Sequence, residues 1–143
     1  MDSSGNLYVA DKQNCRIREV VAATGLIKTV AGNGTCGYTG DGAAATSAQI
    51  NFATGVAIDS VGNIYIADQG NDRIRKVTLA TGVISTIAGT GTAGYNGDNI
   101  AATSAQLEYP FGVRVDPKNN ITSRMRLASG SVVSMPLPGP SPP

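Results

Sequence analysis

The amino-acid sequence predicts an all-β protein built from repeated four-stranded antiparallel sheets, and three observations lead to this fold class. The chain repeats itself at one fixed spacing, short runs rich in β-branched residues recur within each repeat, and turn residues separate these runs. The composition agrees, because 18 of the 143 residues are glycine and only 15% are charged. Such a composition is typical of many turns between short strands.

The repeat has a period of 57 residues and continues without a gap. The segment Gly5–Asp11 returns 57 positions later as Gly62–Asp68. The same spacing relates further pairs of identical residues: Asn14 and Asn71, Arg16 and Arg73, Arg18 and Arg75, Tyr38 and Tyr95, Asp41 and Asp98, Gly55 and Gly112, and Asp59 and Asp116. A match of this length cannot arise by chance, so we expect units at about 1–53 and 54–110 and the start of a third at 111–121.

The complete unit predicts four strands, and we expect them at residues 54–59, 64–68, 73–77 and 83–88. Turn residues separate the strands. In the first turn Asp59 can bond its own downstream backbone, and Gly62 can adopt the left-handed conformation of a tight hairpin. Four antiparallel strands joined by three tight turns form one blade of a β-propeller.

The second strand of this unit is apolar on both of its faces. Ile64 and Ile66 point to one side, and Tyr65 and Ala67 point to the other. A sheet with one wet face would alternate between apolar and polar residues instead. Both faces are therefore expected to be covered, as they are when a blade packs between two neighbouring blades.

The motifs of the unit resemble the NHL repeat. They are the Gly-Val-Ala-x-Asp run that ends at Asp59, the Gly-Asn-Ile-Tyr-Ile-Ala-Asp run that ends at Asp68, and Asn71–Val77. The long insertion that ends in Gly-Tyr-x-Gly-Asp resembles NHL propellers of large secreted or surface proteins, including the teneurin type. The resemblance covers about residues 2–121 and implies a propeller. NHL propellers act as protein-binding, RNA-binding and occasionally enzymatic platforms, so the fold does not settle the function.

The repeat decays after residue 121. The expected Tyr-Ile-Ala-Asp is replaced by Thr-Ser-Arg-Met at 122–125, and the chain closes with the proline-rich segment 135–143. We expect residues 122–143 to be a divergent, disordered tail without strands. A closed propeller needs about four to eight blades, so the sequence predicts a partial propeller of about two blades plus the start of a third. Its uncovered blade faces are expected to favour self-association.

Composition argues against several function classes. Eleven basic and ten acidic residues give a net charge of +1, which does not favour nucleic acid as a partner. No apolar stretch is long enough to span a membrane, and residues 1–6 lack the features of a signal peptide. Histidine is absent, which removes the usual general base and a common zinc ligand. We therefore expect no catalytic residue, no metal and no cofactor.

The loop after the fourth strand of each unit is the best candidate for a binding surface. Its candidate binding residues are Tyr38, Asp41, Tyr95 and Asp98, because insertions in repeat proteins often gather on one functional face. The alternative is structural, with the tyrosine packed under the loop and the aspartate capping a turn or a short helix at 43–49. The Gly-x-Gly-x-x-Gly matches at 32–37 and 89–94 are interpreted as structural loops, because no βαβ unit surrounds them.

The remaining polar residues are given structural interpretations. Asp11, Asp59, Asp68 and Asp116 are expected to be turn residues rather than calcium ligands, since no run of closely spaced acidic residues exists. Arg16, Arg18, Arg73 and Arg75 are expected to lie on a solvated outer strand. Cys15 and Cys36 either form one disulfide or remain two free thiols.

Two function hypotheses remain after these exclusions. The first is a non-catalytic interaction scaffold that binds a protein or glycan partner, favoured by the repeat and by the lack of catalytic residues. The second is a fragment of a propeller enzyme or sensor whose metal-dependent site lies in blades outside this chain.

Overall fold

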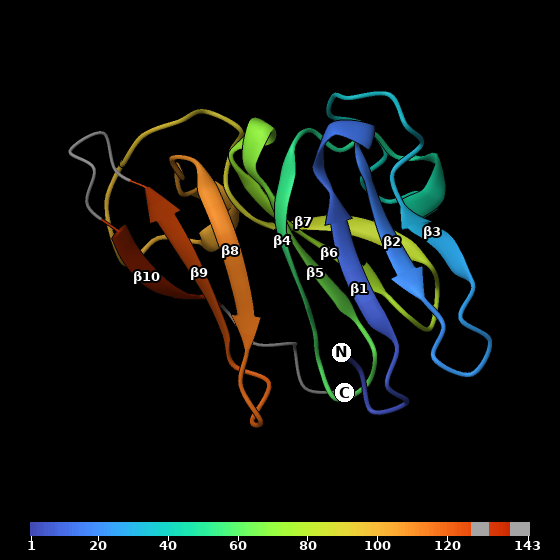
Figure 1. The fold of residues 1–143 in the computed structure, drawn as a ribbon. Helices are drawn as coiled ribbons and strands as arrows, with labels where there is room; N and C mark the ends of the chain where they lie inside the picture. Colours follow the sequence, from blue (N-terminus) through green and yellow to red (C-terminus); the bar gives the residue numbers. More distant parts are fainter. Residues whose placement is uncertain (127–131, 138–143) are drawn as a thin grey trace.

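The computed structural model describes residues 1–126 and the strand at residues 132–137. Its strands form three antiparallel sheets (Figure 1). The first sheet contains β1 (Leu7–Asp11), β2 (Arg16–Val20) and β3 (Ile27–Ala31), and the middle sheet contains β4 (Ala53–Ile58), β5 (Ile64–Asp68), β6 (Arg73–Thr78) and β7 (Val83–Ala88). The third sheet contains β8 (Pro110–Val115), β9 (Ile121–Arg126) and β10 (Val132–Leu137). Four short 3-10 helices lie between strands: η1 (Lys12–Asn14), η2 (Ala45–Ser47), η3 (Gln69–Asn71) and η4 (Ala102–Ser104).

The middle sheet confirms the four predicted strands of the complete unit. Its strands follow one another in the order β4-β5-β6-β7, and the boundaries lie within a residue of those expected. All five residues of β5 are buried. Ile64 and Ile66 belong to the core shared with the first sheet, whereas Tyr65 and Ala67 belong to the core shared with the third sheet. The prediction that neighbouring blades cover both faces is therefore confirmed.

The turn between β4 and β5 follows from the chemistry of Asp59. Its Oδ1 accepts hydrogen bonds from the backbone amides of Val61, Gly62 and Asn63 at 2.9–3.0 Å. Gly62 has a φ of +105°, a backbone conformation that side chains disfavour. The carboxylate thus replaces water as the partner of three turn amides, as the sequence predicts for an aspartate at this position.

The first strands of neighbouring sheets lie side by side, with β4 between β1 and β8 (Figure 1). Two glycines of the repeat approach each other closely here. A Cβ atom placed on Gly55 would lie 2.9 Å from the Cα atom of Gly112. The absence of side chains at this pair therefore allows β4 and β8 to pack backbone against backbone.

A disulfide joins Cys15 and Cys36, whose Cα atoms are 5.3 Å apart. Cys15 is fully buried at the turn between β1 and β2, and Cys36 lies in the long loop that follows β3. The alternative of two free thiols is therefore excluded. The bridge holds the start of this loop against the first sheet.

The prediction of a disordered tail is wrong for the residues that form β9 and β10. Buried Ile121, Ser123 and Met125 alternate with the exposed Arg124 and Arg126, the two-residue period of a strand with one covered face. β10 pairs with β9 at the edge of the third sheet, and an edge strand tolerates a proline such as Pro136, which has no amide hydrogen to donate. The expectation for residues 127–131 and 138–143 lies outside the described residues.

The predicted short helix at 43–49 is reduced to the three residues of η2. The preceding residues pair with the middle sheet instead. The amide of Gly42 donates to the carbonyl of Ile84 at 2.8 Å, and the amide of Ile84 donates to the carbonyl of Ala43 at 3.0 Å. Because these backbone groups bond to a neighbouring strand, they are not available for a longer helix.

Candidate functional site

The loop Gly37–Asp41, here called the first latch loop, reaches from the first repeat to the middle sheet. The Tyr38 hydroxyl donates to Asp41 Oδ2 at 2.6 Å, and the Thr86 hydroxyl of β7 donates to the same oxygen at 2.5 Å. The guanidinium of Arg73 lies 3.6 Å from the centre of the Tyr38 ring, a cation–π contact. Tyr38 and Asp41 are therefore brought together, and both are used in contacts between two blades.

Arg75 forms the centre of this contact and is not solvated. Its side chain is 0% exposed, as is that of its partner Asp68. Its Nη2 atom lies 2.9 Å from Asp41 Oδ1, and its Nη1 atom lies 3.4 Å from Asp68 Oδ2. The guanidinium also donates to the carbonyls of Gln49 at 2.7 Å and Thr39 at 2.8 Å. The predicted outer, solvated position of Arg75 is wrong because the preceding repeat supplies acceptors that replace water.

Asp41 does not cap a helix, contrary to the structural alternative considered for this loop. The N-cap position of η2 is Ala44 and makes no side-chain hydrogen bond. Burial raises the pKa of the Asp41 carboxyl, but hydrogen bonds from Thr86 and Tyr38 and the charge of Arg75 outweigh burial and lower it. The carboxylate is therefore kept charged by the partners that hold it in the latch.

The loop Gly94–Asp98, here called the second latch loop, is not held in this way. Tyr95 is 70% exposed, whereas Tyr38 is 38% exposed. A Cβ atom on Gly40 would contact Ala48, but one on the equivalent Gly97 would have no atom within 4 Å. A binding role for Tyr38, Asp41, Tyr95 and Asp98 stays a prediction, and the second latch loop is the copy whose side chains are accessible.

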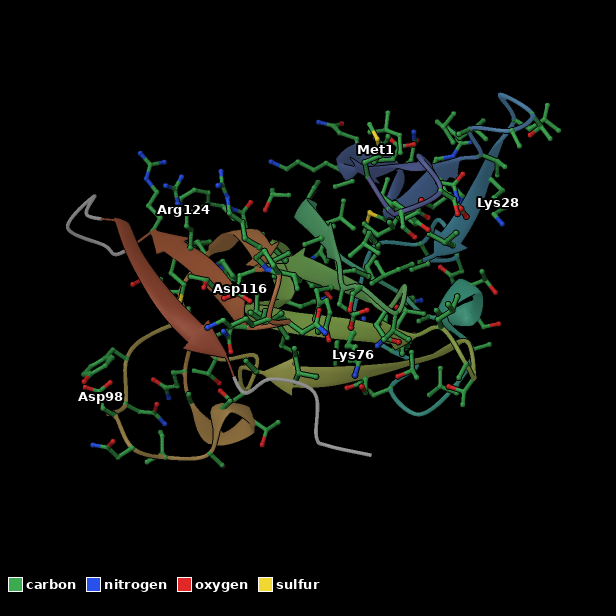
Figure 2. The ribbon with its side chains drawn as sticks, turned by 90° about the horizontal axis from the view of Figure 1, so that it is seen from below. Met1, Lys28, Lys76, Asp98, Asp116 and Arg124 are labelled. Carbon is green, nitrogen blue, oxygen red and sulfur yellow. A yellow bond between two sulfur atoms is a disulfide. The ribbon has the colours of Figure 1, made fainter. Side chains whose placement is uncertain are left out.

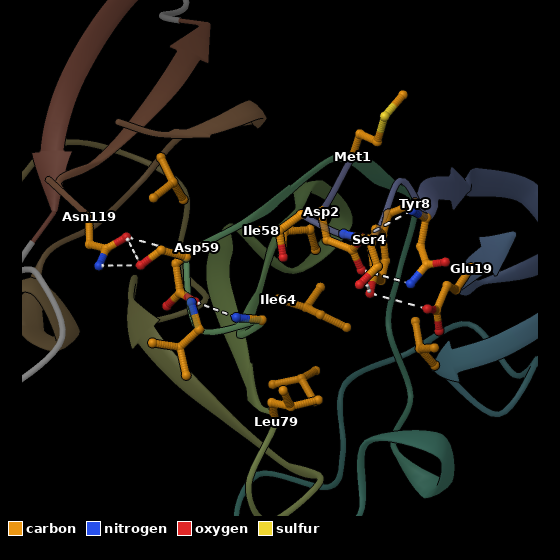
Figure 3. A pocket seen from close by; sticks show the side chains of 18 of the residues that line it. Met1, Asp2, Ser4, Tyr8, Glu19, Ile58, Asp59, Ile64, Leu79 and Asn119 are labelled. Carbon is orange, nitrogen blue, oxygen red and sulfur yellow. Dashed lines mark hydrogen bonds between the residues drawn. The ribbon is translucent and has the colours of Figure 1, made fainter. Parts of the chain in front are cut away.

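A cleft of about 810 Å³ opens between the first and middle sheets, at the end where the Asp59 turn lies (Figure 3). The first repeat contributes Asp2, Tyr8 and Glu19 to its lining, and the middle sheet contributes Asp59 together with the apolar Ile64 and Leu79. The Tyr8 hydroxyl lies 3.1 Å from Asp2 Oδ2 and 3.3 Å from Glu19 Oε1. The cleft thus combines acidic and apolar side chains.

The acidic groups of the cleft already have partners. Asp2 accepts hydrogen bonds from the amides of Ser4 and Asn6, and Lys28 Nζ lies 3.1 Å from Glu19 Oε2. Burial and the nearby carboxylates raise the pKa of the Tyr8 hydroxyl, so it remains a neutral donor. No three His, Cys, Asp or Glu side chains among the described residues are placed to hold a metal ion. The cleft therefore offers a surface for contact, lined by polar groups that bond to one another.

Acid is expected to destabilise the protein partly through Asp59, which also lines the cleft. Burial raises its pKa, but hydrogen bonds from Asn63, Tyr65 and Val61 outweigh burial and lower it. A carboxyl with a depressed folded-state pKa contributes stability above its unfolded pKa of about 4, and this contribution is lost as the pH falls through the folded value. Urea unfolding at pH 7 and pH 3 is therefore expected to show a smaller acid-induced loss for Asp59→Asn than for the wild type.

The matched control for this experiment is Glu108→Gln, which removes a carboxylate that accepts no hydrogen bond within the described part of the chain. Its acid-induced loss is expected to match that of the wild type. Equal losses in Asp59→Asn and the wild type would contradict the role given to the Asp59 turn.

Two aromatic residues that the sequence analysis did not single out occupy equivalent positions in the two repeats. Phe52 precedes β4 and Tyr109 precedes β8, at the opposite end of the strands from the Asp59 turn. Both are exposed, and their φ values are +51° and +46°. Lys12 Nζ lies 5.8 Å from the centre of the Phe52 ring. Their spacing of 57 residues was a signal in the sequence that an aromatic residue recurs here.

Comparison with known families identifies the repeat. Residues 18–120 match the family model described as the teneurin NHL domain. The chain belongs to the teneurin NHL domain family. Teneurin-1 of Gallus gallus is 31% identical in an alignment that covers 95% of this chain. This NHL-repeat chain spans 6% of the length of that relative.

Solved structures agree with the propeller fold of this NHL-repeat chain. A structural genomics protein of unknown function from Bacteroides thetaiotaomicron superposes with a TM-score of 0.76 at 20% identity, over 92% of this chain and 32% of that one. A streptogramin B lyase superposes with a TM-score of 0.51 at 17% identity, over 96% of this chain and 39% of that one. At these identities the likeness shows the fold alone, which is that of a β-propeller fragment.

The described part of this NHL-repeat chain has no helix with the length and apolar character that a membrane span requires.

Proposed function

We propose that this NHL-repeat chain is a non-catalytic scaffold that binds a protein partner through Phe52 and Tyr109. The observation that carries the proposal is the repetition of an exposed aromatic side chain on a left-handed backbone at the start of β4 and β8. A bulky residue with a positive φ is a true outlier, and such strain of about 1–3 kcal/mol tends to gather at functional sites.

The chemistry of these side chains suits protein recognition. Large aromatic residues are favoured at the energetic centres of protein interfaces. Lys12 next to Phe52 and Glu108 next to Tyr109 add charged groups of both signs at this end of the sheets. A non-catalytic role is supported by the absence of histidine from the sequence and by the carboxylates of the cleft, which are engaged in hydrogen bonds.

The disulfide supports a location in an oxidising compartment. Disulfides persist in secreted and extracellular proteins and are rare in the reducing cytosol. Cys15 of the Cys15–Cys36 bridge is fully buried, and this bridge supports a scaffold that works outside the cytosol.

The proposal is tested with a displayed library of random peptides, from which a peptide that binds the wild-type chain is selected. Phe52→Ala and Tyr109→Ala are each expected to weaken binding by about 30-fold, the effect of losing about 2 kcal/mol at a central interface residue. Leu79→Ala is the matched control, because Leu79 is an exposed apolar residue that lines the cleft at the other end of the sheets.

Equal binding by the wild type and both aromatic variants would contradict the proposed surface. If no peptide is selected and the chain instead binds a glycan array in a way that depends on Phe52 and Tyr109, the proposed class of partner changes from a protein to a glycan. Turnover of a lactone or ester panel by the purified chain would contradict the non-catalytic role.

A further inference from the structure

The exposed tripeptide Asn33-Gly34-Thr35 lies in the loop between β3 and the first latch loop. Its sequence, Asn-x-Thr with x other than proline, is the acceptor motif for N-linked glycans. Asn33 and Thr35 are both exposed. The acceptor atom, Asn33 Nδ2, lies 3.4 Å from the carbonyl oxygen of Ser47, which is longer than an ordinary hydrogen bond of this kind. The side-chain amide of this exposed residue is therefore only weakly held.

The fold does not require an asparagine at position 33. Asn33 Oδ1 accepts a hydrogen bond from the backbone amide of Thr35 at 2.9 Å, which closes a tight turn. In the second repeat the equivalent residue is Thr90, and its hydroxyl accepts from the backbone amide of Thr92 at 3.3 Å. A threonine thus closes the same turn, so the local structure does not account for the asparagine.

The exposure of Asn33 follows from its place in the repeat. Thr90, at the same place in the second repeat, is exposed as well, although its sheet shares a core with a neighbouring sheet on each face. The first latch loop contacts Arg73 and Thr86 of that sheet and leaves Thr90 exposed. A blade packed against the first sheet in the same way would therefore leave Asn33 exposed too.

A second tripeptide of this kind, at residues 120–122, is used by the fold. Asn120 Nδ2 donates to Asp116 Oδ2, and the backbone amide of Asn120 donates to Asp116 Oδ1, both at 2.8 Å. The equivalent Asn63 donates in the same two ways to Asp59. Asn120 is therefore the structural asparagine of the hairpin turn, a role that Asn33 does not have.

The two tripeptides are well separated in the molecule. β3, which precedes the first, and the β8–β9 turn, which contains the start of the second, lie on opposite sides of the middle sheet (Figure 1). Figure 2 shows Lys28 of β3 and Asp116 of that turn apart in the same way. A substitution in one tripeptide therefore leaves the surroundings of the other intact.

We infer that Asn33 is the acceptor of an N-linked glycan, with a lipid-linked oligosaccharide pyrophosphate as the donor. The amide nitrogen of Asn33 forms a bond to C1 of the first sugar and gives up one hydrogen as a proton. The bond between C1 and the pyrophosphate oxygen breaks, and the lipid pyrophosphate leaves. The Thr35 hydroxyl completes the motif that the transferase recognises. The product carries a bulky, hydrophilic group on the surface of the first repeat.

The inference rests on the location outside the cytosol given under the proposed function, and not on Phe52 and Tyr109. Disulfides form in the compartments through which proteins are exported, and the bridge to Cys15 is made by Cys36, the residue that directly follows Thr35. The glycan is measured by mass alone, so a failure to select a binding peptide leaves the test below unaffected.

The test is secretion of the chain from a eukaryotic cell line behind a secretion leader, with mass spectrometry before and after treatment with peptide N-glycosidase F. The wild-type chain is expected to lose the mass of one glycan, and peptide mapping is expected to find aspartate in place of Asn33. Asn33→Thr supplies the residue that closes the turn in the second repeat, so it is expected to fold and to lack this glycan. Thr35→Ser keeps the hydroxyl and is expected to keep the glycan.

Two further variants use the repeat as a control. Thr90→Asn creates the tripeptide at the equivalent place in the second repeat and is expected to add one glycan. Thr122→Val removes the second natural tripeptide and is expected to leave the number of glycans unchanged. A wild-type chain secreted without a glycan would overturn the inference. A number of glycans that is unchanged by Asn33→Thr would overturn it as well.

Discussion

Replacing Arg75 with alanine is expected to lower the free energy of unfolding by about 3–5 kcal/mol, the usual cost of removing one partner of a buried ion pair. The fully buried guanidinium contacts two carboxylates and two backbone carbonyls from both repeats. Burial already raises the pKa of Asp68, and the donors Asn71, Asn51 and Arg75 oppose this effect. Without Arg75 the Asp68 carboxylate would be buried without a positive charge beside it.

Urea denaturation of the wild type and of Arg75→Ala measures this loss. Arg75→Lys is expected to be intermediate, because an ammonium keeps the charge but cannot bond several acceptors in one plane as a guanidinium does. Arg114→Ala is the control, because Arg114 is an exposed arginine on β8 and such substitutions usually change stability by less than about 0.5 kcal/mol. A loss below about 1 kcal/mol for Arg75→Ala would contradict the central position given to this residue.

Removal of the disulfide is expected to destabilise the chain by about 2–4 kcal/mol. The bridge closes a segment with a sequence separation of 21 residues and fixes Cys36 directly before the first latch loop. Its loss increases the conformational entropy of the unfolded chain. It also releases one end of the loop that binds Arg75. The measurement compares urea unfolding of the wild type with that of the double variant Cys15→Ala and Cys36→Ser.

Reductant supplies the control for this second comparison. Added dithiothreitol is expected to lower the stability of the wild type towards that of the double variant and to leave the double variant unchanged. If reduced and oxidised wild-type chains unfold at the same urea concentration, the bridge does not stabilise the fold.

The strands of the middle sheet could be predicted because their signals are local. Turn residues such as Asp59 and Gly62 act within a few positions of themselves, and the apolar faces of β5 are visible in five consecutive residues. The failure at β10 has a local cause as well. β10 lies at the edge of the third sheet, where a strand accepts a proline that an interior strand would reject. β9 lies between β8 and β10, and its alternation of buried Ile121, Ser123 and Met125 with exposed arginines was overlooked.

The latch could not be predicted in the same way. The acceptors of Arg75 come from Thr39, Asp41 and Gln49 of the preceding repeat, and only the packing of two sheets brings them to the arginine. The sequence analysis named Tyr38 and Asp41 as candidate binding residues, a role that stays a prediction, and the near-neutral net charge suggested that the arginines face solvent. Phe52 and Tyr109 were missed although an aromatic residue recurs there at the repeat spacing, and their left-handed backbone has no signature in one sequence.

Gly55 and Gly112 let two blades approach each other closely in backbone terms at β4 and β8, the first strands of their sheets. At these first strands little room separates the two backbones, whereas the space between the following strands is filled by side chains as large as isoleucine, leucine and tyrosine. The spacing between the two blades therefore increases from this glycine pair outwards. A methyl group at Gly55 would force β4 and β8 apart. The outer strands of the two blades would then move farther than these inner strands do.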